Sequence, residues 1–226
     1  MGDVGVAGWI HLAVFGVAVP LLVIRSKRFL DQGVELSSFA PHLLSAMLQL
    51  AIFALLSLVV AHLEGLELFP AAWPTVDAWL AGGLLLAAAL AIMRPRWKKA
   101  VAEGRPIVRL FSPRDRRERL LWTMASALAG FSEELTWRGV QFGLLSALTG
   151  QPLVAAFVCA VMFGAAHYVQ GHEASMAIVP FAFAFQLLVL YTGSLYVAMV
   201  VHCLYDVIAG FSYGRLASVA DRENQN

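Results

Sequence analysis

Long stretches of apolar residues, nearly free of charge, recur along this chain of 226 residues. A helix that crosses a lipid bilayer needs about 20 mostly apolar residues. Seven segments approach this length: 6–24, 42–62, 76–93, 120–148, 151–168, 174–192 and 194–210. Hydrophobic residues make up 60% of the chain and charged residues 14%, which is more apolar material than one soluble core of this size can bury. The sequence therefore predicts an all-α, polytopic bundle of about seven transmembrane helices.

The Lys and Arg residues are unevenly distributed, which predicts how the chain is oriented in the membrane. Fifteen of the sixteen lie in residues 25–28, 94–119 and 215–222. Seven spans put these three clusters on one side, and the opposite loops carry acidic residues but no basic one. Because cytoplasmic loops collect Lys and Arg, we expect the N-terminus outside and the C-terminus in the cytoplasm. The net charge of +1 gives no general attraction to nucleic acid, which we do not expect as a partner.

Composition divides the chain into three parts. Residues 1–105 hold the first three spans and the first part of a basic cytoplasmic loop, and residues 106–212 hold the charged residues that lie inside the membrane. Residues 213–226 form a short polar tail that we predict to be disordered and cytoplasmic. The basic segment 94–119 interleaves Arg residues with apolar ones. Such a segment is typical of a helix that lies on anionic headgroups, so we predict anionic lipid as its partner.

Charged and imidazole side chains inside the membrane are confined to the C-terminal half, whereas the first three spans carry only His11 and His62 near their ends. A buried charge costs about 2.5–3.5 kcal/mol on insertion scales, so such groups pair and face the protein interior. The residues concerned are Glu133, Glu134, Arg138, His167, His202 and Asp206. Their restriction to one half indicates a plain N-terminal half and a polar-cored C-terminal half.

Helical spacing sorts these residues into pairs. Glu134 and Arg138 are four residues apart and can form an ion pair on one face, as can His202 and Asp206. Glu133 is rotated by about 100° from Glu134, and it lacks an obvious local partner. In the predicted topology Glu133, His167, His202 and Asp206 all lie in the cytoplasmic half of the bilayer. We therefore expect these four side chains to meet at one level.

Two kinds of hydrolytic chemistry fit this set. In the first, Glu133 takes a proton from water that His167 holds and polarises, while His202 and Asp206 donate hydrogen bonds to the oxyanion formed at a peptide carbonyl. Asp206 can donate only in its protonated form. In the second, Glu133, His167 and His202 bind Zn²⁺ and leave one position for water, as in a metalloprotease. The sequence has no H-E-x-x-H helix, which favours the metal-free version.

Three short motifs resemble those of a known family. Glu133-Glu134-x-x-x-Arg138, Phe163-x-x-x-His167 and His202-x-x-x-Asp206 occur in the order found in the CPBP intramembrane proteases. These comprise type II CAAX prenyl proteases and the related ABI-like bacteriocin-processing and bacteriocin-immunity proteins. Asp206 stands where the family has Asn or Asp. The match covers residues 115–210, and the N-terminal spans carry no motif.

The resemblance implies an intramembrane endopeptidase whose protease core is the range 106–212. It assigns catalytic roles to Glu133, His167, His202 and Asp206, and supporting roles to Glu134, Arg138 and Phe163. The substrate would be a membrane-embedded or lipid-anchored protein or peptide, such as a prenylated tail, a leader or pheromone precursor, or a sorting tag.

The short chain suggests a bacterial relative in the inner membrane. Two other functions fit the same residues. One is a non-enzymatic bacteriocin-immunity or membrane scaffold protein, and the other is a proton-coupled transporter, since intramembrane Glu and His also form proton relays.

Overall fold

The computed structural model describes residues 3–32, 39–70, 72–105 and 107–223, which form helices and contain no strand. Several helices join end to end into longer rods. The first rod is α1 (Val6–Ala13), η1 (Val14–Ala18) and α2 (Val19–Asp31); the fourth is α6 (Arg116–Glu133), η2 (Glu134–Gln141) and α7 (Phe142–Thr149). The other rods are α3 (Phe39–Leu63), α4 (Val76–Ala102), α8 (Pro152–Ala166), α9 (His172–Thr192) and α10 (Leu195–Glu223). The short helices α5 (Ile107–Phe111) and η3 (Tyr168–Gln170) lie in connections.

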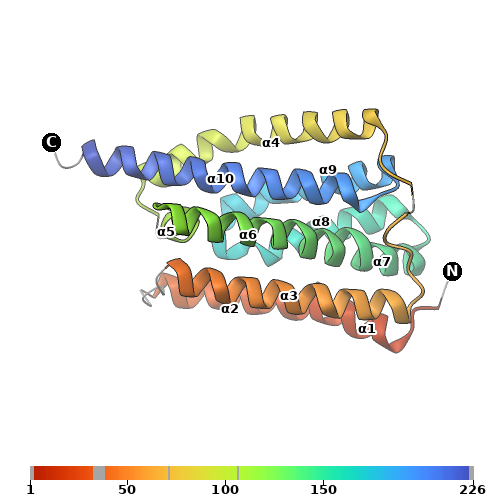
Figure 1. Cartoon of the computed structure of the whole chain (residues 1–226). Coiled ribbons are helices and arrows are strands. Elements are labelled where there is room, and N and C mark those ends of the chain that lie inside the picture. Colours follow the sequence, from red (N-terminus) through yellow and green to blue (C-terminus); the bar gives the residue numbers. More distant parts are fainter. Residues whose placement is uncertain (1–2, 33–38, 71, 106, 224–226) are drawn as a thin grey trace.

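The rods lie side by side with their axes roughly parallel, and the described chain starts and ends at opposite ends of the bundle (Figure 1). Helix α6 packs against both α3 and α10, α4 packs on α10, and α8 packs on α9. The helix ends that carry the three basic clusters all lie at the end of the bundle where α10 finishes (Figure 1). We call this the basic end. The predicted polytopic helical bundle is therefore confirmed.

The number of spans differs from the expected seven. Among the described residues, five helical segments are long and apolar enough to cross a membrane: Val6–Asp31, Phe39–Leu63, Val76–Ala102, His172–Thr192 and Leu195–Val219. Helix α8 has 15 residues, so it is about 22 Å long and shorter than a bilayer core of about 30 Å. The rod 116–149 carries two Glu and one Arg in its middle. These two segments, α8 and the rod 116–149, were both expected to be spans, and both border the polar site described below.

The polar middle of that rod is shielded by the other helices. All eight residues of η2 are buried, although they include Glu134, Arg138 and Gln141. This stretch is π-helical, a geometry that is rare and concentrates at functional sites. The rod begins where the side chain of Asp115 accepts a hydrogen bond from the Glu118 amide, and it ends at Gly150, whose φ of 64° is left-handed. The Gly150-Gln151-Pro152 break thus separates two helices, because Pro152 begins α8.

Two expectations about the basic end were wrong. The tail predicted to be disordered continues α10 as far as Glu223, and only residues 224–226 of it lie outside the described chain. Segment 94–119 is not one surface helix, because it divides into the end of α4, the short α5 and the start of α6. In α5, Val108 and Leu110 are buried within the bundle. The side chains of residues 106, 107 and 109 lie outside the described part, as does the expected boundary residue 106.

Candidate active site

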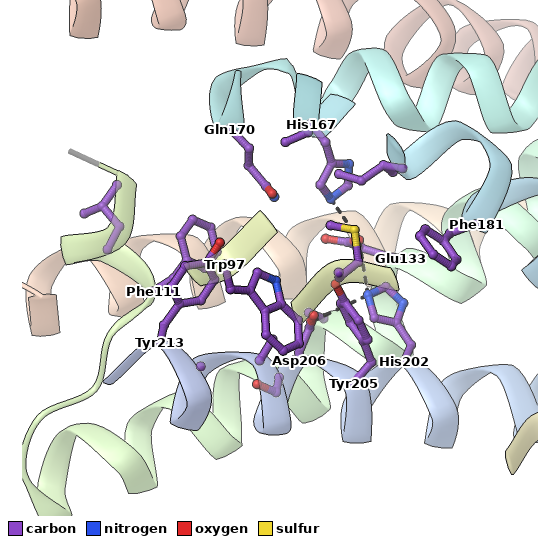
Figure 2. A pocket seen from close by; sticks show the side chains of 18 of the residues that line it. Trp97, Phe111, Glu133, His167, Gln170, Phe181, His202, Tyr205, Asp206 and Tyr213 are labelled. Carbon is purple, nitrogen blue, oxygen red and sulfur yellow. Dashed lines mark ion pairs between the residues drawn. The ribbon is translucent and has the colours of Figure 1, made fainter. Parts of the chain in front are cut away.

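Four of the expected site residues meet between three segments of the bundle, as Figure 2 shows. Glu133 ends α6, His167 follows α8 directly, and His202 and Asp206 lie one turn apart on α10. The Oε2 atom of Glu133 is 3.7 Å from Nε2 of His167 and 3.8 Å from Nε2 of His202. Nε2 of His202 is in turn 3.5 Å from Oδ2 of Asp206. The four side chains therefore lie together as expected, and their catalytic roles stay a prediction.

His167 is held in one orientation by the residue one turn earlier. Its Nδ1 donates a hydrogen bond of 2.9 Å to the backbone carbonyl of Phe163, and its ring lies 4.3 Å from the Phe163 ring. Because α8 ends at Ala166, the imidazole projects from a helix end. With the proton on Nδ1, the lone pair of Nε2 points toward Glu133.

His202 is held from the opposite side by the Glu134–Arg138 pair. Its Nδ1 donates to Oε1 of Glu134 at 2.7 Å. Nη1 of Arg138 lies 3.2 Å from the same oxygen, an ion-pair distance but without hydrogen-bond angles. The Arg138 guanidinium also lies over the Phe163 ring, 4.1 Å from its centroid. Glu134 and Phe163 therefore contact one imidazole each, and Arg138 lies against both Glu134 and Phe163. Arg138 and Phe163 also line the space between the imidazoles.

A close approach of α6 and α10 brings His202 within reach of Glu134. At Gly130 a Cβ atom would lie 2.7 Å from the carbonyl oxygen of Met199 and 2.9 Å from the amide nitrogen of Cys203. Only glycine allows two helix backbones to come this close. One turn further along α10, Nε1 of Trp122 donates to the carbonyl of Asp206 at 2.8 Å. These two contacts set the position of α10 beside α6.

A cavity of about 340 Å³ runs from these residues toward the basic end, a size within the range of small-molecule sites. Glu133, His167, His202 and Asp206 all line it. Sequence reasoning missed other lining residues, which include Trp97, Ser126, Gln170, Tyr205 and Tyr213. Ser126 and Tyr213 carried a usable signal, since they lie seven residues before Glu133 and seven residues after Asp206 and so share the helical faces of these residues. Arg96, Lys99 and Arg105 line the cavity where it reaches the basic end.

The donor atoms of the site decide whether a metal ion fits. Zinc binds His nitrogen at about 2.0–2.1 Å and carboxylate oxygen at about 2.0–2.2 Å. Within the described ranges no group of three His, Cys, Asp or Glu side chains is arranged to hold a metal ion, and this includes Glu133, His167 and His202. The described arrangement thus does not form the zinc set as it stands. The choice between no cofactor and Zn²⁺ stays a prediction.

The charge balance of the site is unusual for a membrane interior. Three carboxyl groups and two imidazoles surround one guanidinium, and the buried Oε2 of Glu133 has no hydrogen-bond partner among the described residues. Buried polar atoms are nearly always hydrogen-bonded, so an orphaned one needs an explanation. An acceptor that faces two imidazole nitrogens beside a cavity is placed to bind and activate water.

Comparison with known proteins is consistent with this geometry. A family model described as type II CAAX prenyl endopeptidase, Rce1-like, matches residues 116–208, which include all three motifs. Comparisons with curated proteins and with solved structures gave no match. The matched range runs from the start of α6 into α10 and contains Glu133 and its neighbours His167, His202 and Asp206. The match covers 93 of the 226 residues and supports the expected resemblance: over this range the chain is similar to type II CAAX prenyl endopeptidases of the Rce1-like family.

Proposed function

We propose that Glu133 is the general base of a peptide hydrolase that cleaves membrane-associated substrates. The observation that carries this proposal is the unpartnered Oε2 of Glu133, which lies 3.7 and 3.8 Å from the Nε2 atoms of two imidazoles. These distances are too long for direct hydrogen bonds and leave the oxygen free to take a proton from water. Oε2 is shielded from bulk solvent, but Glu133 lines the cavity that runs to the basic end, so a water molecule in the cavity can approach its carboxylate.

The reaction divides between the two sides of the site. Glu133 removes a proton from a water molecule whose other hydrogen is held by Nε2 of His167, and the water oxygen bonds to the peptide carbonyl carbon. The oxyanion accepts hydrogen bonds from a protonated Asp206 and from Nε2 of His202, which donates from both ring nitrogens and therefore acts as an imidazolium. Glu133 then gives its proton to the leaving nitrogen as the C–N bond breaks. Glu134 and Arg138 position His202, and Phe163 positions His167.

Substrate access follows from the direction of the cavity. Because the cavity runs to the basic end and Lys and Arg collect in the cytoplasm, we place this end on the cytoplasmic side, with the N-terminus outside. A membrane-embedded or lipid-anchored protein or peptide would enter from there. The membrane would be a bacterial inner membrane, and its anionic headgroups would contact Arg94, Arg96 and Lys98 at the end of α4.

Mapping protein termini in membranes tests the proposal for a substrate of any sequence. The N- and C-termini of the membrane proteome are compared between cells that carry the wild type, Glu133→Gln, and the control Glu67→Gln at an exposed carboxylate. We expect at least one uncut precursor to accumulate with Glu133→Gln only. A scaffold or immunity protein would leave all termini unchanged, and a proton-coupled transporter would instead lose substrate flux in liposomes.

The proposal also makes the reaction independent of a metal. Elemental analysis of the purified active protein, with cleavage measured before and after chelation, tests this. We expect no stoichiometric metal and no loss of cleavage. One zinc per chain, with activity that chelation removes and zinc restores, would replace this mechanism by the zinc alternative.

A further inference from the structure

A second polar cluster lies in the bundle away from the cavity. His11 of α1, Ser57 of α3, and Thr136 and Gln141 of η2 are each at most 2% exposed. Oγ of Ser57 is 2.9 Å from Oγ1 of Thr136 and 3.2 Å from Nε2 of His11. Nδ1 of His11 is 3.0 Å from Oε1 of Gln141. This chain of contacts, which we call the polar ladder, ties the π-helical segment to two N-terminal helices.

The polar ladder has one consistent arrangement of protons. The amide nitrogen of Gln141 donates to Sδ of Met162 at 3.5 Å, so Oε1 of Gln141 is the acceptor for Nδ1–H of His11. Nε2 of His11 then accepts from the Ser57 hydroxyl, whose oxygen accepts from Thr136. Each of these side-chain groups has a partner, in contrast to Glu133. A network that is fully satisfied specifies one arrangement of its helices.

The spacing of these contacts depends on the π-helical geometry. Just before η2, Oγ of Ser132 also bonds to α3, at 2.7 Å from the carbonyl of Leu50. In a regular α-helix each residue turns by about 100°, so Gln141 would point to the side opposite Ser132. The wider π-turns, with hydrogen bonds from i to i+5, bring Gln141 back toward α1 and α3, which are neighbours. The contacts of Ser132, Thr136 and Gln141 can therefore form together only in this register.

We propose that His11, Ser57, Thr136 and Gln141 are positioning residues, which hold η2 in its π-helical register and thereby aim Glu133 and Glu134 at the two imidazoles. This inference rests on the proposed role of Glu133. Glu133 immediately precedes η2 and Glu134 begins it, so a change of register rotates both carboxylates. Misplacement of a reacting group by about 1 Å can reduce a rate about 100-fold. His11 and Ser57 of the N-terminal helices thus contribute to catalysis although neither of them lines the cavity.

The test compares threonine variants on one helical rod. Thr136→Val keeps the shape of the side chain and removes the hydroxyl, whereas Thr136→Ser keeps the hydroxyl. Thr123→Val is the matched control, because the exposed Thr123 bonds only to the Arg119 carbonyl of its own helix. The substrate is the precursor that accumulates in Glu133→Gln cells, presented to purified protein in liposomes. We expect Thr136→Val to lower kcat by about tenfold to 100-fold. We expect KM to stay the same, Thr136→Ser to restore kcat, and Thr123→Val to have no effect.

The outcomes separate this inference from the proposed function. If Thr136→Val keeps the wild-type kcat while Glu133→Gln is inactive, Glu133 remains the base and the positioning role is refuted. If Glu133→Gln cleaves like the wild type, both the proposed function of Glu133 and the positioning role of the polar ladder are refuted. If Thr136→Val does not fold, the double variant Ser57→Ala/Thr136→Val replaces it, because it removes both hydroxyls of one hydrogen bond and leaves only Nε2 of His11 without a donor. Wild-type kcat in that folded double variant would equally refute the inference.

Discussion

The N-terminal helices α1–α4 and the C-terminal helices α6–α10 both bury polar side chains, but of different kinds. The N-terminal half contributes the neutral His11 and Ser57, and both are hydrogen-bonded. The C-terminal half contributes ionisable groups, and the Oε2 atoms of Glu133 and Glu134 have no partner among the described residues. A satisfied network stabilises one helix arrangement, whereas an unsatisfied acceptor beside a cavity is available for chemistry. The comparison therefore distinguishes polar groups that hold the helices from polar groups that react.

Removing a charge from the C-terminal half should have the largest effect on stability. Arg138→Met leaves Glu134 buried without its cation, which costs about 3–5 kcal/mol. Ser57→Ala in the N-terminal half leaves neutral partners unpaired and costs about 1–3 kcal/mol. Thermal unfolding of both variants in one detergent measures the difference. Equal losses would remove the distinction between the two halves.

A double variant sharpens this result. Glu134→Gln/Arg138→Met removes both charges of the pair, so it should recover most of the stability that Arg138→Met loses. It should not recover cleavage, because Oε1 of Glu134 no longer orients Nδ1 of His202 as a carboxylate. Full activity in the double variant would show that the pair has only a structural role.

Replacing a closely packed glycine should have the next largest effect on stability. Gly130→Ala would force a methyl group against the α10 backbone, at 2.7 Å from the Met199 carbonyl oxygen, and should cost about 1–3 kcal/mol. It should also reduce cleavage, because His202 moves with α10. Gly83→Ala in α4 is the control, since nothing lies within 4 Å of the added Cβ. Unchanged cleavage by Gly130→Ala would contradict the role of this close approach.

The smallest effect is expected at the exposed carboxylate of the basic end. Oε2 of Glu173 lies 3.5 Å from Nζ of Lys99 and 3.4 Å from Nη2 of Arg105. Exposed ion pairs contribute little and are screened by salt. Glu173→Gln should therefore unfold at the wild-type temperature at high salt and differ only slightly at low salt. If Glu173→Gln lost as much stability as Arg138→Met, burial of a charge would not determine how much stability its removal costs.

Much of the candidate site could be predicted because placing its charged residues inside a membrane costs free energy. Glu133, Glu134 and Arg138 stand out in an apolar sequence, and spacing of four residues pairs Glu134 with Arg138. The predicted topology places His167 and His202 at one depth. Because each buried charge needs a partner, the sequence indicates which residues must pair, and the family motifs add the order of the helices.

The polar ladder and the π-helical segment could not be predicted, because no local sequence pattern indicates them. The contacts of the polar ladder join residues up to 130 positions apart, and neutral groups such as Ser57 and Thr136 are ordinary in membrane helices. Periodicity of 3.6 residues cannot reveal a π-helical segment, whose register depends on its neighbours. Two of the seven expected spans fall short of a simple crossing, the rod 116–149 because of the charges in its middle and α8 because of its length.

The most direct measurement of the central claim is the cleavage rate of purified Glu133→Gln protein in liposomes, with the accumulated precursor as substrate. The substitution keeps the size of the side chain and removes its ability to accept a proton from water. The account predicts a rate at least about 100-fold below the wild type, with an unchanged unfolding temperature. A folded Glu133→Gln protein that cleaves within about threefold of the wild-type rate would contradict it, since general-base catalysis contributes more than that.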